Sequence, residues 1–139
     1  MNEALSAAVA AHPQRLDNLI SAGRALKPVQ TGVVYPLNSE ALMGAVQAGK
    51  DGLIAPVLIG PANGVRALAK TEGADISAWK IVDVPDPEDA AARACHTAGR
   101  GEIQALMKGS LHTEELMHEV VARDSGLCTG RRMSHVFVI

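Results

Sequence analysis

Residues 31–60 read TGVVYPLNSEALMGAVQAGKDGLIAPVLIG, and this stretch predicts a strand, a helix and a second strand. Residues 31–35 and 53–59 are short runs of β-branched and aliphatic residues, which is typical of buried strands. Between them the apolar spacing predicts a helix from about Ser39 to Gly49, with Ser39 as its N-cap. Parallel strands joined through one helix form a right-handed βαβ unit. The stretch therefore predicts an α/β fold.

The same alternation continues on both sides of this stretch. Residues 1–27 predict a helix, opened by Pro13, in which Leu16, Leu19, Ile20 and Gly23 share one face. After Gly60-Pro61 a helix is expected, and further strands are expected at residues 79–84, 104–107 and 134–139. We interpret the chain as a succession of βαβ units.

Two later helices have recognisable signals. The sequence Asp86-Pro87-Glu88-Asp89 predicts a helix start, with an Asp cap, Pro in the first position and acids in the first turn. Cys95 lies on the predicted buried face of that helix, which favours inert packing over nucleophilic catalysis. Another helix is expected after Thr113, with Leu116 on its inner face.

The length of 139 residues fits a single domain. We expect a three-layer fold, with an open, mostly parallel sheet and helices on both faces. Ligands of such sheets bind at the carboxyl ends of the strands. The candidate loops are those after Tyr35, Ile59, Val84 and Met107.

Composition excludes several classes of function. The 13 basic and 15 acidic residues leave a net charge of −2, and aromatic residues make up only 2% of the chain, which argues against a nucleic-acid partner. No apolar stretch is long enough to span a membrane, and the N-terminus does not resemble a secretory signal. Cys95 and Cys128 form no metal or disulfide pattern, and the histidines lack metal-site spacing, so we expect a cytoplasmic protein without a metal.

The most informative motif for function is residues 108–113, KGSLHT, between a short strand and a helix. A phosphate there could be bound by free amides at the turn at Gly109, by the Ser110 or Thr113 hydroxyl, and by the charge of Lys108. The alternative is that Thr113 only caps the helix, with Glu114 and Glu115 complementing its dipole. The spacing alone does not decide between these interpretations.

Other motifs favour structural roles. Residues 60–66 form a glycine-bearing turn without the pattern of a P-loop. Most clusters of surface cations are solvated, although one of Arg123, Arg131 and Arg132 could meet a phosphate or cofactor tail. No catalytic triad or nucleophile elbow is present in the sequence, and we assign no catalytic residue.

The chain resembles the phosphate acetyl/butyryltransferases (phosphotransacetylases and phosphotransbutyrylases), some of which are bifunctional enzymes with an enoyl-CoA hydratase module. The similarity begins near residue 13, and its most specific part is residues 105–113, ALMKGSLHT. The other segments that resemble the family are 33–36, 55–61, 81–83, 115–121 and 134–138. Met117-His118-Glu119 stands where acetate-specific members have an arginine, which resembles the butyryl-type branch.

The resemblance implies acyl transfer between an acyl-CoA and inorganic phosphate, with coenzyme A as a substrate and no separate cofactor. It implies an isocitrate/isopropylmalate dehydrogenase-like fold, a homodimer, and an active site between two α/β domains. Residues 1–139 would be the N-terminal domain, inactive by itself. The residues that match the family's phosphate- and CoA-binding loop are Lys108, Gly109, Ser110, His112 and Thr113.

Two other functions are compatible with the fold. The first is a non-catalytic binding or dimerisation module that has lost the chemistry. The second is a relative of the decarboxylating dehydrogenases, but the acid cluster and nicotinamide site that it needs are not found in the sequence. The chain ends in an apolar run at Ile139, from which we expect a truncated protein. The sequence does not indicate which acyl group would be transferred.

Overall fold

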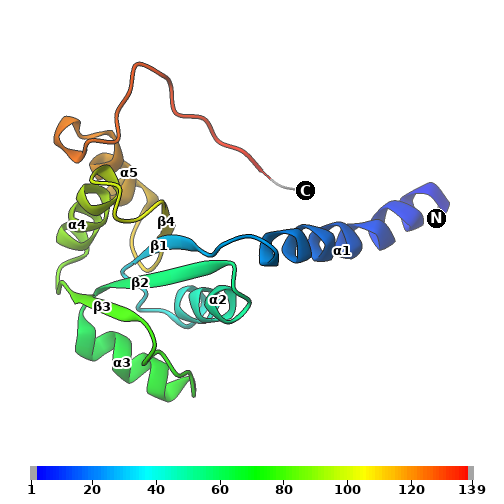
Figure 1. The fold of residues 1–139 in the computed structure, drawn as a ribbon, viewed down its shortest axis with the longest axis horizontal. Helices are drawn as coiled ribbons and strands as arrows, with labels where there is room; N and C mark the ends of the chain where they lie inside the picture. The colour runs from blue at the N-terminus through cyan, green and yellow to red at the C-terminus, as the bar shows by residue number, and fades with distance from the viewer. Residues whose placement is uncertain (1–2, 138–139) are drawn as a thin grey trace.

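The computed structural model describes residues 3–137, with side chains from residue 14 onward. Helices and strands alternate through these residues (Figure 1). In chain order the elements are α1 (Glu3–Arg24), β1 (Val29–Val34), α2 (Ser39–Lys50), β2 (Ile54–Gly60), α3 (Ala62–Thr71), β3 (Lys80–Asp83), α4 (Pro87–Gly99), β4 (Ala105–Lys108), α5 (Thr113–Val121) and the 3-10 helix η1 (Arg123–Ser125).

The four strands form one parallel sheet in the order β3-β2-β1-β4. Val33 of β1 lies between Leu58 of β2 and Met107 of β4. The chain moves from β1 through β2 to β3 at one edge, and then returns to place β4 on the other side of β1. The predicted α/β fold with a parallel sheet is confirmed.

Successive residues of each strand point to opposite faces of the sheet, and both faces are apolar. Val33 and Leu58 pack with α2 and α3 on one face, while Val34 and Ile59 pack with α4 on the other. Helix α5 lies against α4. Cys95 of α4 is fully buried in this second core, as the sequence predicts.

The start of α4 agrees with its sequence signal, and the start of α2 differs by one residue. Asp86 accepts hydrogen bonds from the amides of Glu88 and Asp89 at 2.9 and 3.1 Å. The N-cap of α2 is Asn38, because its Oδ1 accepts from the Ala41 amide at 2.7 Å. Ser39 is the first helical residue, so its prediction as the cap is wrong.

The predicted helix near the N-terminus is present as α1, but Pro13 lies within it and does not open it. Leu16 and Leu19 are 55% and 53% exposed, because α1 extends away from the sheet (Figure 1). Its last turn is joined to the domain by an ion pair of 2.9 Å between Arg24 and Asp51.

The strand predicted at 134–139 is wrong for residues 134–137, and residues 138–139 lie outside the described part. Residues 134–137 form no ladder with another strand, and the side chains of Val136 and Phe137 are 79% and 78% exposed. Their β-branched and aromatic composition fits a strand, but a strand also needs a hydrogen-bonded neighbour. The segment instead follows an open path beside the domain (Figure 1).

Candidate functional site

The strand order places a topological switch point between β1 and β4. The chain leaves β1 toward β2 on one side, whereas β4 pairs on the opposite side of β1. In open parallel sheets, ligands bind outside the carboxyl ends of the strands at such a point. The loops that meet there are residues 35–38, after β1, and residues 109–112, after β4.

The backbones of these two loops are hydrogen-bonded to each other. The Gly109 amide donates to the Val34 carbonyl at 2.8 Å, and the Ser110 amide donates to the Tyr35 carbonyl at 2.7 Å. A Cβ atom on Gly109 would overlap both carbonyl oxygens, so only glycine permits this approach. The expectation of a free amide at Gly109 is wrong, because the pairing of β4 with β1 continues beyond the last strand residue.

Side chains connect the same loops. Asn38 Nδ2 donates to Ser110 Oγ at 3.1 Å, across the switch point. Tyr35 has φ +56°, an unusual conformation for a residue with a side chain, and its hydroxyl donates to the Pro85 carbonyl at 3.1 Å. Three loops at the carboxyl edge are therefore held together by direct contacts.

The β4 loop retains several donors for a ligand. Lys108 Nζ donates to the Leu111 carbonyl at 2.8 Å and to the Gly109 carbonyl at 3.3 Å, which leaves one of its three N–H groups. Within the described part of the chain, the amides of Leu111, Thr113 and Glu114 donate to no protein acceptor. The half-buried Ser110 hydroxyl lies beside them.

The first turn of α5 also contains a carboxylate, Glu115, that accepts a hydrogen bond at the helix start. The N-cap is His112, and its amide donates to Glu115 Oε2 at 2.9 Å. Thr113 is the first helical residue, so the alternative in which Thr113 is the cap is wrong. An incoming anion would have to compete with Glu115 for the His112 amide, but the Thr113 amide is free of such competition.

The sequence pattern indicated Lys108, Gly109, Ser110, His112 and Thr113. In the structure these residues run from the last residue of β4, through the loop, to the first residue of α5. Tyr35 and Asn38 were missed as partners of that loop. Asn38 could have been found as a helix cap, since it precedes an apolar helical pattern. Its bond to Ser110 depends on the pairing of β1 with β4, which no local pattern reveals.

The loop presents N–H and O–H donors of the kind that bind anions, but its Ser110 hydroxyl is not placed for covalent chemistry. Ser110 Oγ contacts an amide nitrogen of Asn38 rather than a base that could activate it. Among the described residues, no group of three or more His, Cys, Asp or Glu side chains is arranged to hold a metal ion.

Other residues considered from the sequence have structural surroundings. Burial raises the pKa of the Cys95 thiol to about 11, with a smaller contribution from Glu119, so the thiol stays protonated at neutral pH. In the turn at residues 60–66, the Ala62 amide donates to Asp83 Oδ1 at 2.9 Å, which satisfies the start of α3. Arg123, Arg131 and Arg132 are exposed.

The chain is similar to known phosphate acetyltransferases and phosphate butyryltransferases. A phosphate acetyltransferase of Rhizobium meliloti is 46% identical over 129 residues, which cover 93% of this chain and 41% of the relative. A phosphate acetyltransferase of Rickettsia typhi is 41% identical over 122 residues, covering 88% and 35%. A phosphate butyryltransferase of Clostridium beijerinckii is 27% identical over 125 residues, covering 90% and 41%.

The chain is homologous to the phosphate acetyltransferases and butyryltransferases. The resemblance stated from the sequence is thereby confirmed. The chain spans about two fifths of the length of the Rhizobium relative. Identity is higher to the Rhizobium and Rickettsia acetyltransferases than to the Clostridium butyryltransferase. The closeness to the butyryl-type branch expected from residues 117–119 stays a prediction. No protein-family model matches the chain.

A solved structure supports the fold. The branched-chain phosphotransacylase of Enterococcus faecalis V583 superposes with a TM-score of 0.52 at 22% identity, covering 70% of this chain and 33% of that one. The predicted likeness to the dehydrogenase fold stays a prediction. None of the helices in residues 3–137 combines the length and apolar character needed to cross a membrane.

Proposed function

We propose that this chain contributes one wall of an active site that transfers an acyl group between coenzyme A and inorganic phosphate. The observation that carries the proposal is the homology to phosphate acetyltransferases over 93% of the chain. The β1 and β4 loops, which meet at the switch point, supply the position for that wall.

The reaction needs a phosphate held against the carbonyl of a thioester. A phosphate oxygen attacks the acyl carbon, the carbon–sulfur bond breaks, and the thiolate leaves with its electron pair. The proton lost by the phosphate is returned to the thiolate, which gives an acyl phosphate and free coenzyme A. Cationic and amide donors stabilise the developing negative charge.

In this proposal the β4 loop binds and orients rather than reacts. Lys108 offers its remaining N–H group, and Ser110 offers its hydroxyl. The free amide of Thr113, at the positive end of α5, adds a further donor for a phosphate oxygen. Gly109 permits the close approach of the two loops, and His112 begins the helix. The base and other catalytic groups would come from outside this chain.

The experiment is a titration of the 139-residue chain with phosphate and with coenzyme A, followed by amide shifts in NMR and by thermal unfolding. We expect shifts at Ser110 and Thr113, and stabilisation of about 2.7 kcal/mol at 100 times the dissociation constant. Lys108→Gln should weaken binding, whereas Lys70→Gln, on the exposed side of α3, should not. Shifts absent from this loop for both ligands would contradict the proposal.

An activity assay tests the proposal that this chain supplies only part of the active site. The isolated chain with acetyl-CoA or butyryl-CoA and phosphate should form no acyl phosphate at an enzymatic rate. Ordinary turnover would show that residues 1–139 contain a complete site. Comparison of the two acyl-CoA substrates would then give the acyl preference.

The second candidate is a non-catalytic binding or dimerisation module. The engaged amides of Gly109 and Ser110 and the acid at the His112 amide favour it, because they reduce the capacity of the loop for anions. A chain that forms a dimer in solution but binds neither phosphate nor coenzyme A would fit this candidate.

We further propose a cytoplasmic homodimer. A reducing compartment fits the free cysteines Cys95 and Cys128, and the dimer rests on the resemblance to the family. Light scattering of the purified chain tests the dimer: a mass twice that of 14.5 kDa is expected, and a monomer at all concentrations would contradict it. Localisation of a tagged chain in its host cell tests the compartment: signal outside the cytoplasm would contradict it.

A further inference from the structure

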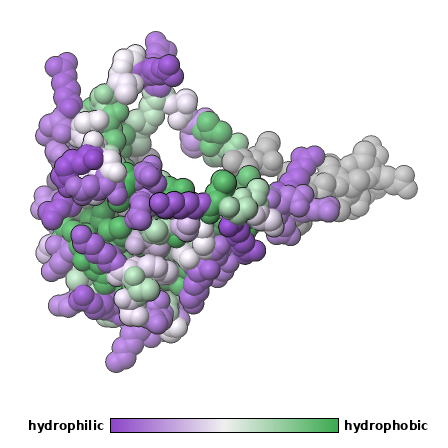
Figure 2. All heavy atoms as spheres, viewed as in Figure 1, coloured by the Kyte–Doolittle hydropathy of each residue, from purple (hydrophilic) through white to green (hydrophobic). Residues whose placement is uncertain are grey.

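Beside α4, part of one sheet face is incompletely covered by the described residues. Helix α4 covers Val34 and Ile59, but toward β3 the side chains of Val57 and Val82 are only half-buried. They line a hollow of about 300 Å³ together with Ile59. Figure 2 shows hydrophobic atoms at this place, between α4 and β3, surrounded by hydrophilic ones. The hollow therefore has an apolar floor.

Cations form the rim of this hollow. Lys80 of β3, Arg93 of α4 and Arg100 at the end of α4 line it, against one carboxylate, Glu102. Arg100 is paired with Glu102 at 3.0 Å. Within the described residues, neither Lys80 nor the Arg93 guanidinium forms an ion pair or a hydrogen bond through its side chain. Lys80 acts on the Glu102 carboxylate only through its charge, so both cations can still contact an anion directly.

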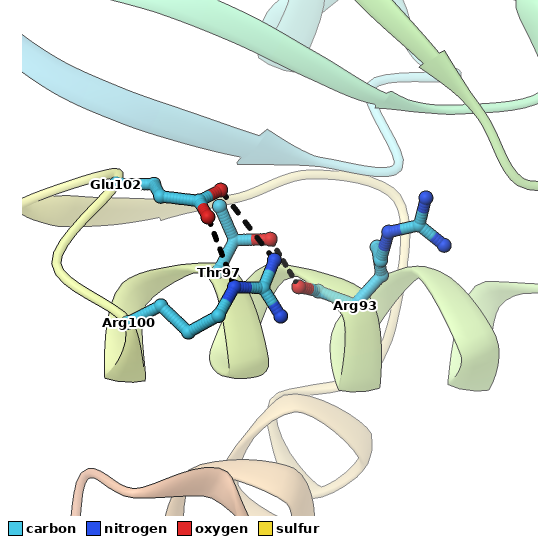
Figure 3. A network of polar contacts seen from close by, with 4 residues as sticks. All are labelled: Arg93, Thr97, Arg100 and Glu102. Carbon is cyan, nitrogen blue, oxygen red and sulfur yellow. Dashed lines mark hydrogen bonds and ion pairs between the residues drawn. The ribbon is translucent and has the colours of Figure 1, made fainter.

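The side chains on α4 are arranged toward the hollow. Arg93, Thr97 and Arg100 extend from the same side of the helix (Figure 3). The Thr97 hydroxyl donates to the Arg93 carbonyl at 2.7 Å, and the guanidinium of Arg93 points away from the Arg100–Glu102 pair. Its five N–H groups are available for two oxygens of one anion.

A second hollow, of about 620 Å³, continues from the first toward the end of β3. It shares Arg93 and Arg100 with the first and adds His96. Asp83 and Asp89 also line it, so this outer part is close to neutral, whereas the inner part has an excess of positive charge. An anionic group is therefore favoured in the inner part, near Arg93 and Lys80.

We propose that this hollow is a binding site for a small organic phosphate, whose phosphate is held by Arg93 and Lys80 and whose apolar part lies on Val57 and Val82. Small-molecule sites combine such an apolar floor with a few polar groups that fix orientation, and they have volumes in this range. The site is separate from the loops at the switch point, because it lies over β2 and β3 rather than between β1 and β4.

The probe is phenyl phosphate, which has both an apolar body and a phosphate, with inorganic phosphate and phenol as partial probes. NMR of the full 139-residue chain should show phenyl phosphate shifting Lys80, Val82, Arg93 and Thr97. Each partial probe should bind this hollow more weakly than phenyl phosphate. Shifts confined to residues 108–113 would overturn the proposal and assign the ligand to the other loop.

Substitutions make the test specific. Arg93→Gln should weaken phenyl phosphate about tenfold, as expected for the loss of one charge-assisted contact. Arg66→Gln, the same change on the exposed side of α3, should leave the affinity unchanged. Shifts at Val82 and Thr97 report binding in this hollow, whereas shifts at Ser110 and Thr113 report binding at the proposed active site, which separates the two sites.

Arg93 and Lys80 are exposed, so their substitution should leave the amide spectrum of the folded chain intact. If Arg93→Gln disturbs α4, Lys80→Gln serves as the second variant. It should also weaken the binding of phenyl phosphate. Unchanged affinity in a folded Arg93→Gln or Lys80→Gln variant, or no shift in the hollow with phenyl phosphate, would overturn the proposal.

Discussion

Asn38 and Ser110 come from opposite sides of the switch point and share a hydrogen bond of 3.1 Å from Nδ2 to Oγ. Asn38 also caps α2 through the Ala41 amide, so one side chain fixes a helix start and a loop contact. This bond links the loop after β1 to the loop that we propose for phosphate.

A double-mutant cycle measures that link. Asn38→Ala removes the cap and the bridge and should cost about 1 kcal/mol, while Ser110→Ala removes the bridge alone. If the bridge stabilises the domain, the double variant should lose less than the sum, with a coupling of about 0.5–1.5 kcal/mol. Urea unfolding measures these free energies, and strict additivity would show that the contact contributes nothing.

Glycine at position 109 is a requirement of the backbone contact between β1 and β4. Gly109→Ala would place a Cβ against the carbonyls of Val34 and Tyr35, so we expect a loss of about 1–3 kcal/mol in the free energy of unfolding. The matched control is Gly44→Ala in α2, where a Cβ meets nothing within 4 Å and a gain of about 0.5–1 kcal/mol is expected. Equal effects of the two changes would contradict the close packing of the loop.

The cap of α4 should contribute measurably to stability. Asp86→Ala leaves the amides of Glu88 and Asp89 without their acceptor and should cost about 1 kcal/mol. Asp86→Asn is the control, because its side-chain oxygen can accept the same bonds. Thermal unfolding distinguishes the two variants, and an unchanged midpoint for Asp86→Ala would show that water replaces the cap without cost.

Because of Cys95, the free energy of unfolding should fall at alkaline pH. Its pKa is raised to about 11 in the folded protein, from an ordinary value of 9.0, chiefly by burial. The folded state therefore holds the proton longer than the unfolded state between pH 9.0 and about 11. The contribution of the thiol is complete below pH 9.0 and is lost as pH rises through this window, by at most about 1.4 kcal/mol per unit.

Denaturant unfolding across this pH window, with Cys95→Ala as the comparison, checks the effect. The variant should lack this part of the alkaline loss, although it is less stable at neutral pH. A thiol reagent at pH 8 offers a second measurement, in which exposed Cys128 should react in the folded protein and buried Cys95 should not. Rapid labelling of both thiols would contradict the burial of Cys95.

Local patterns were sufficient for most elements of the fold. The apolar run at 53–59 and the cap at Asp86 each depend on interactions within a few residues, so sequence spacing predicts them. The failure at residues 134–137 has the opposite cause, because a strand exists only with a neighbour in the sheet. The same limit applies to the order of the strands, which places β4 beside β1 rather than beside β3.

The sequence predicted which loop forms the candidate site, but it did not predict the contacts that this loop makes with other segments. The composition of residues 108–113 indicated donors at a strand-to-helix turn, and the structure places that loop at the switch point. Tyr35, Asn38 and the engaged amides of Gly109 and Ser110 became visible only through contacts between distant segments. Arg93 was missed because its significance depends on the open sheet face beside α4.

The pairing of Thr31 with Ala105 has a consequence for how the domain assembles. Strands β1, β2 and β3 can come together from segments that are close along the chain, whereas β4 must close a loop that spans most of it. We expect this closure to be slow and to come late in folding. Until β4 has paired with β1, the switch point between these two strands does not exist and cannot bind a ligand. A ligand that binds there afterwards would stabilise the docked state of β4 and slow its detachment.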